Sequence, residues 1–147
     1  MRQKMLAVLI VGLLVAADDV KSDSKQDMEK MQGEWTMVSG SRDGQPIPDE
    51  FVQSLRRTIS GDKFSVKREG ESLSAGTFKL DASKTPKTID LTLTEGQASG
   101  QTIQGIYELQ GDTLKICYSA PGQPRPKEFS AAEGSMQTFA TWKRAKK

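Results

Sequence analysis

The stretch KTPKTIDLTL, residues 84–93, decides the fold class of this chain. Its apolar residues Ile89, Leu91 and Leu93 alternate with threonine and aspartate. A period of two puts the apolar side chains on one face of a β-strand and the polar side chains on the other. The stretch is therefore predicted to be a strand that turns one face toward a core.

Segments of the same kind lie on both sides of this stretch and are separated by turn pairs such as Gly61-Asp62 and Gly111-Asp112. There is too little helix between them for parallel crossover units, so the fold is predicted to be all-β and antiparallel. About eight short strands suit a small up-and-down β-barrel. The predicted strands are residues 34–41, 56–60, 63–68, 72–80, 88–93, 102–109, 113–118 and 136–144.

Two short helical segments are expected beside the strands. Asp27 can cap a helix that continues to about Gln32, and this helix is predicted to close one end of the barrel. A single helical turn is expected after Pro48, because proline suits the start of a helix.

The chain begins like an exported protein. Arg2 and Lys4 precede an apolar run over residues 5–15, and Ala17 suits a cleavage site. We therefore expect a signal peptide at residues 1–17, a flexible lead-in at 18–26 and the barrel domain at 27–147, with a periplasmic or secreted location. The apolar run is short for a bilayer span, which needs roughly 20 residues, so no membrane span is expected after cleavage.

The composition of the chain argues against several classes of function. Cleavage after Ala17 removes two of the 21 basic residues and none of the 19 acidic ones, which leaves no compositional argument for nucleic acid. The chain has no histidine, which excludes Ser-His-Asp and Cys-His catalysis. The strand acids Asp90 and Glu108 are predicted to point away from the interior. We expect no catalytic residues, no metal site and no cofactor.

Two residue sets resemble known proteins. Gly33-Glu34-Trp35 resembles the G-x-W motif of lipocalins, and Arg144 matches the arginine that packs on that tryptophan as a barrel-closing pair. Five further stretches, in this order, resemble an uncharacterised lipocalin-like domain family abundant in planctomycete bacteria. They are MQGEWTMVSGSRDGQPIP (31–48), GDKFSV (61–66), KTPKTIDLTL (84–93), GIYELQGDTLKICY (105–118) and PGQPRPKEF (121–129).

This resemblance implies a lipocalin-type barrel and no established activity. The chain departs from lipocalins proper because it lacks a long C-terminal helix and a disulfide, having one cysteine only. These departures weaken the inference that the chain transports small molecules as lipocalins do. They weaken the inference of a barrel fold less.

The barrel interior leaves two functions open. The inward side chains could line a pocket for a small hydrophobic molecule, or they could fill a solid core whose rim loops dock an envelope or secreted protein. The oligomeric state is open in both cases. The candidate ligand-binding residues are Phe78, Leu91, Ile103, Tyr107, Ile116 and Tyr118.

The loop PGQPRP, residues 121–126, follows the strand that holds Cys117. Its prolines present Arg125 rigidly, either as part of a lid or docking surface or as the partner of a nearby acid. Alternation places Cys117 on the outer face of its strand. Because cysteine is usually buried, we expect the proline loop or the helical turn after Pro48 to cover it and keep it unreactive.

Overall fold

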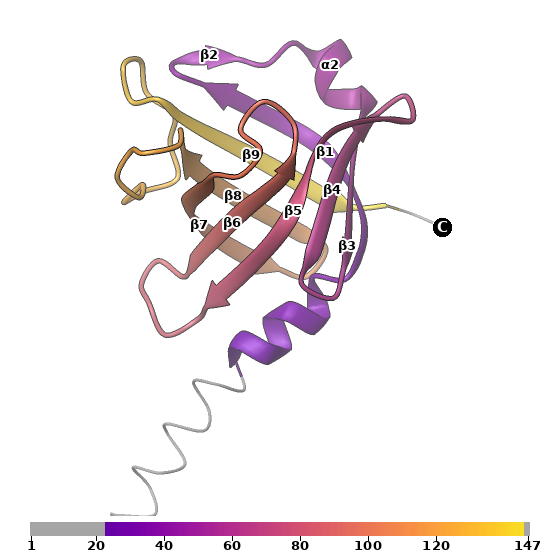
Figure 1. Ribbon diagram of the computed structural model, residues 1–147, viewed down its shortest axis with the longest axis vertical. Coiled ribbons are helices and arrows are strands. Elements are labelled where there is room, and N and C mark those ends of the chain that lie inside the picture. The colour runs from indigo at the N-terminus through magenta and orange to yellow at the C-terminus, as the bar shows by residue number, and fades with distance from the viewer. Residues whose placement is uncertain (1–22, 146–147) are drawn as a thin grey trace, which may run out of the picture.

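A computed structural model describes residues 23–145 of the chain. The predicted signal peptide and residues 18–22 of the predicted lead-in lie outside the described residues. Eight antiparallel strands close into an up-and-down barrel, as predicted, and a very short additional strand, β2, pairs with the end of β1 (Figure 1). The strands are β1 (Gly33–Arg42), β2 (Gln45–Pro46), β3 (Leu55–Ser60), β4 (Lys63–Arg68), β5 (Glu71–Asp81), β6 (Thr88–Glu95), β7 (Thr102–Gln110), β8 (Thr113–Ser119) and β9 (Gln137–Arg144).

The barrel closes where its first and last strands pair. The register between β1 and β9 runs from Trp35 opposite Arg144 to Arg42 opposite Thr138, with a bulge between Met37 and Ser39. Closure gives both strands a hydrogen-bonding partner on each side and removes the exposed sheet edges. Alternate residues of the barrel strands then face one shared interior, whereas both residues of β2 are exposed.

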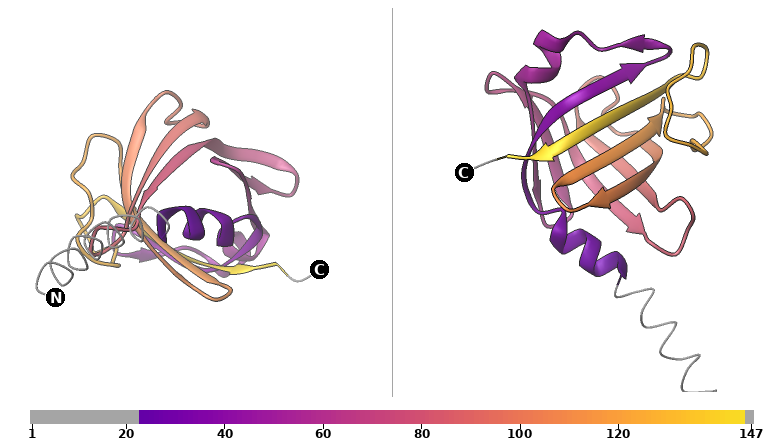
Figure 2. Two further views of the ribbon diagram at one scale, coloured as in Figure 1. Left: turned by 90° about the horizontal axis from the view of Figure 1, so that it is seen from below. Right: turned by 180° about the vertical axis from the view of Figure 1, so that it is seen from behind.

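The N-terminal helix lies across one end of the barrel, as Figure 2 shows in the view from below. Residues 23–30 are helical, so the helix begins before the expected cap and takes in residues that we predicted as lead-in. Asp27 lies inside the helix and is not its cap. Its carboxylate accepts hydrogen bonds from the Tyr107 hydroxyl at 2.8 Å and from Lys87 Nζ at 2.9 Å. The buried Tyr107 hydroxyl thus finds its acceptor on the helix.

Trp35 and Arg144 form the predicted closing pair at this end. Trp35 is fully buried, and the Arg144 guanidinium carbon lies 4.4 Å from the centre of its ring. The same guanidinium donates hydrogen bonds to the backbone carbonyls of Gln32 and Lys30, which end the helix. Gly33 joins helix to strand at φ +114°, a conformation that side chains with a Cβ rarely adopt.

The opposite end carries the second helix, α2 (Asp49–Ser54), which begins directly after Pro48 as predicted. Only Val52 of this helix is fully buried. The end that carries α2 is bordered by this helix and the longer loops, whereas the N-terminal helix lies at the other end (Figure 1).

Within residues 23–145, no helix has both the length and the apolar character needed to cross a membrane.

The variant Tyr107→Phe tests the closed end. It should lower the free energy of unfolding by about 1–2 kcal/mol in urea denaturation, because the buried Asp27 carboxylate loses a donor. Tyr118→Phe, which breaks no hydrogen bond found in the described structure, is the control and should cost less. Burial raises the pKa of Tyr107, so the advantage of the wild type over Tyr107→Phe should shrink above about pH 10, where the unfolded phenol ionises. Equal losses for the two variants would contradict this assignment.

Candidate functional site

An interior pocket of about 290 Å³ occupies the half of the barrel that faces α2. Three of the predicted ligand-binding residues line it: Leu91, Ile103 and Tyr118. The other apolar side chains of its wall come from six strands and from the β2–α2 segment. They are Met37, Ile47, Phe51, Leu55, Phe64, Val66, Leu73, Leu93, Ala140 and Trp142.

The other three predicted ligand-binding residues do not line this pocket. Phe78, Tyr107 and Ile116 are buried in the barrel core but are not among the residues that line the pocket. Tyr107 is bound to Asp27 there and is not a polar contact for a ligand. Alternation along the strands had placed these side chains inside the barrel correctly, but it carries no information on depth along the barrel axis.

Arg57 is the buried charged residue of the pocket, and it was not among the predicted interior residues. It lies between Leu55 and Ile59 on β3, and all three face the interior. Arg57 is only 5% exposed, and among the described residues it is the only buried basic one. The signal for it was present in the sequence, because position 57 falls on the apolar face of the strand, where a charged residue is unusual.

The surroundings of the Arg57 guanidinium are aromatic. Its central carbon lies 4.8 Å from the ring centre of Phe64 and 5.5 Å from that of Trp142. Its Nε atom is buried and has no hydrogen-bond partner among residues 23–145. Burial lowers the pKa of Arg57 to about 10, an effect partly opposed by the nearby Tyr118 phenol. The group therefore stays positively charged at neutral pH.

The charges that line the pocket are all positive. Its wall includes Arg57 and Arg42, and among the described residues that line it there is no aspartate or glutamate. Arg42 lies at the exposed edge, where its Nε donates a hydrogen bond to Thr138 Oγ1 at 3.2 Å. None of the ion pairs found within residues 23–145 involves Arg57. The pocket is an apolar space whose wall holds a buried cation with no ion-pair partner in the described part of the chain.

The mouth of the pocket carries exposed apolar surface. Leu73 on β5 is 40% exposed, and Phe51 of α2 lies beside it among the lining residues. The Arg68 guanidinium covers the ring of Phe51 at 4.7 Å and donates a hydrogen bond from Nε to Ser54 Oγ. These contacts hold α2 at one side of the opening.

Replacing Arg57 by methionine should stabilise the protein. The folded-state pKa of Arg57 lies below its unfolded value, so burying the charge lowers stability at every pH below about 10. Arg57→Met should raise the free energy of unfolding by roughly 1–3 kcal/mol, measured by urea denaturation at pH 7. Arg56→Met, the neighbouring change on the outer face, should change it by less than about 0.5 kcal/mol. A lower free energy of unfolding for Arg57→Met would contradict this prediction and would show that the contacts of the guanidinium stabilise the fold.

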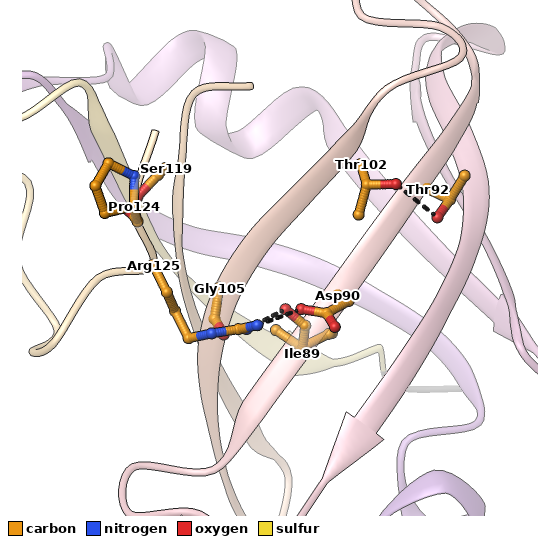
Figure 3. A network of polar contacts seen from close by, with 8 residues as sticks. All are labelled: Ile89, Asp90, Thr92, Thr102, Gly105, Ser119, Pro124 and Arg125. Carbon is orange, nitrogen blue, oxygen red and sulfur yellow. Dashed lines mark hydrogen bonds and ion pairs between the residues drawn. The ribbon is translucent and has the colours of Figure 1, made fainter. Parts of the chain in front are cut away.

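Arg125 anchors the loop at residues 120–136 to the outside of the barrel (Figure 3). Its guanidinium forms an ion pair with Asp90 at 2.7 Å and donates hydrogen bonds to the carbonyls of Gly105 at 2.7 Å and Ile89 at 3.3 Å. Of the two roles expected for Arg125, pairing with a nearby acid is confirmed. Its donors are engaged with β6 and β7.

Cys117 is covered by the same loop. Its side chain is fully buried on the outer face of β8, and its thiol donates a hydrogen bond to the Ser130 carbonyl at 3.1 Å. Phe129 of the loop packs on Phe139 of β9, which lies opposite Cys117 in the sheet. The expected cover is confirmed, and the loop supplies it. Burial raises the pKa of the thiol, which keeps it protonated at neutral pH.

The anchor and the cover can be tested together. Arg125→Ala should accelerate the reaction of Cys117 with a thiol reagent about 5- to 30-fold, because local opening becomes roughly 1–2 kcal/mol easier. Lys127→Ala, an exposed change in the same loop, is the control and should leave the rate near that of the wild type. Rapid labelling of the wild-type protein would contradict the assignment of Cys117 as a covered residue.

The two strand acids sit apart on the outer face. Asp90 pairs with Arg125, and Glu108 pairs with Lys115 at 3.7 Å. Neither acid lines the interior pocket. A larger hollow of about 920 Å³ lies outside the barrel between Asp90, Arg125 and the loop of residues 82–87. It mixes lysines with acids on an outer surface, so the interior pocket is the better candidate for holding a small molecule.

These features define a class of structure: a small antiparallel barrel, closed at one end, with an apolar pocket in the other half. Comparison of the chain with protein-family models, with curated proteins and with solved structures gave no match in any of the three. The resemblance to the planctomycete lipocalin-like family stays a prediction.

Proposed function

We propose that this protein is an exported, noncatalytic barrel that binds one small hydrophobic molecule in its interior pocket. The observation that carries the proposal is the pocket itself, about 290 Å³ in volume and walled mainly by aliphatic and aromatic side chains. Its volume lies near the lower end of the range for small-molecule sites, roughly 300–1,000 Å³. A ligand of modest size fits this space.

The physical drive for binding is removal of apolar surface from water. Each buried methylene contributes about 0.8 kcal/mol, which is close to a fourfold change in Kd. The exposed Leu73 at the mouth and the half-buried Phe51 give a tail further apolar contact as it enters. Affinity is therefore expected to rise with chain length until the pocket is full.

Docking of a protein through the rim loops has less support. The arginine that would serve as the exposed contact, Arg125, already binds Asp90 and two backbone carbonyls. A noncatalytic role is supported by the placement of Asp90 and Glu108, which are paired with different cations and share no cleft.

The proposal is tested with neutral ligands, so that charge plays no part. Calorimetric titration with 1-octanol, 1-nonanol and 1-decanol should give one site, with Kd falling about fourfold per added methylene. Ala140→Leu, which fills space in the pocket wall, should weaken binding of 1-decanol at least about tenfold, with a loss of stability of at most about 1–3 kcal/mol from the added volume. Thr94→Leu is the control, because Thr94 is exposed on β6.

Two results would contradict the proposal. One is the absence of any alcohol binding to the wild type, and the other is equal binding by the wild type and Ala140→Leu. Native mass spectrometry of the protein purified from the envelope of its own cells adds an independent readout. A retained small molecule supports the pocket, whereas a co-purifying protein in its place supports docking.

A further inference from the structure

We propose that the natural ligand is an amphiphile with a single carboxylate, and that this carboxylate pairs with the Arg57 guanidinium in the wall of the pocket. This inference rests on the proposed function and adds the chemical class of the head group. It starts from the one side chain in the pocket that hydrophobic binding does not explain.

Among residues 23–145, Arg57 has no partner of the kind that a buried cation requires. Buried charges in proteins are normally paired or fully hydrogen bonded, since desolvation of an ion costs several kcal/mol. Arg57 forms none of the ion pairs found in the described part of the chain, and its buried Nε donates to no protein acceptor there. A bound anion would supply acceptors to the two terminal nitrogens of this guanidinium, which form none of the hydrogen bonds found among residues 23–145 and, unlike Nε, are not fully buried.

The contacts with Phe64 and Trp142 do not replace such a partner. Rings at 4.8 Å and 5.5 Å from the guanidinium carbon attract its charge and fix its position. The N–H donors lie in the plane of the guanidinium group, and a ring gives no lone pair to them. The aromatic rings therefore hold the cation in place while its donors stay available to the pocket.

The chemistry of the wall selects a carboxylate. A planar carboxylate matches the two-pronged donor arrangement of arginine, and one negative charge balances the one buried positive charge. An amine would add a third cation to a wall that already holds Arg57 and Arg42 and, among residues 23–145, no acid. A phosphate monoester would bring close to two negative charges to a site with one buried cation, and its desolvation would cost more.

The position of Arg57 sets the orientation of the ligand. Arg57 is 5% exposed, whereas Leu73 at the mouth is 40% exposed. The head group therefore lies deep in the barrel against Arg57, and the tail extends past Leu93 and Ile103 toward Phe51 and Leu73. This arrangement places the apolar end of the ligand beside the apolar residues of the opening.

Ligands with the same ten-carbon chain and different head groups test the proposal. The wild type is titrated at pH 8 with decanoate, 1-decanol, decylamine and decyl phosphate at submicellar concentrations. Decanoate should bind at least about tenfold tighter than 1-decanol, as expected for a charge-assisted hydrogen-bonded pair. Decylamine and decyl phosphate should both bind more weakly than decanoate.

Variants at neighbouring positions assign the preference to Arg57. In Arg57→Met the ratio of the decanoate and 1-decanol affinities should fall to about one or below, while 1-decanol still binds. Arg56→Met removes the same charge from the outer face, where Arg56 lies 3.9 Å from Glu34, and should keep the wild-type ratio. Arg57→Lys keeps the charge without the two-pronged donors and should give an intermediate ratio of the two affinities. The lysine variant replaces the methionine variant in this test if the latter does not fold.

The outcomes separate this inference from the proposed function. Binding of 1-decanol without a preference for decanoate would overturn the head-group assignment and leave the pocket intact. Tighter binding of decyl phosphate would overturn the choice of carboxylate, and a preference that persists in Arg57→Met or disappears in Arg42→Met alone would overturn the role of Arg57. Failure of every ligand to bind would overturn both proposals.

Discussion

Pairing of the first strand with the last is the constraint on which the rest of this structure depends. Once β1 and β9 are joined, every inward side chain shares one enclosed space, and its position along the barrel axis decides what it can do. Near the N-terminal helix the space is filled by Trp35, Tyr107 and their partners. Farther along it holds the pocket. A filled core and an apolar pocket, the two alternatives that the sequence left open for the interior, thus occur together in the same barrel.

The sequence was enough to predict the eight strands, because alternation is a local property and turn pairs mark where it restarts. It was not enough to predict the role of Asp27. The Tyr107 hydroxyl that donates a hydrogen bond to the Asp27 carboxylate lies 80 positions away in the chain. It also could not separate Leu91 from Phe78. Both face inward and lie opposite each other on β5 and β6, yet only Leu91 lines the pocket, and alternation along a strand does not carry that difference. Arg57 could have been found from its place between Leu55 and Ile59, had inward positions been searched for charge as well as for apolar residues.

The buried guanidinium and the closed end have opposite effects on stability. The hydrogen-bonded cluster at Asp27 and the stacked pair of Trp35 and Arg144 stabilise one end of the barrel. Arg57 brings a desolvated charge into the other half. Natural proteins commonly tolerate a local loss of stability where function requires it, provided that the remaining structure compensates. Under our proposal, occupancy by an anion would recover part of that loss, so the loaded protein would be the more stable form.

Closure of one end of the barrel by the N-terminal helix has a consequence for the route by which a ligand would enter and leave. Because the barrel is closed at one end, a ligand of the kind we propose would enter and leave at the other end. If the head group pairs with Arg57, it would be the first part of the ligand to enter the barrel and the last part to leave it. Delivery to another protein or to a lipid surface requires the acceptor to meet the rim, where α2 stands beside the opening. Under our proposal, closure of one end of the barrel would thereby leave the other end as the place of ligand exchange.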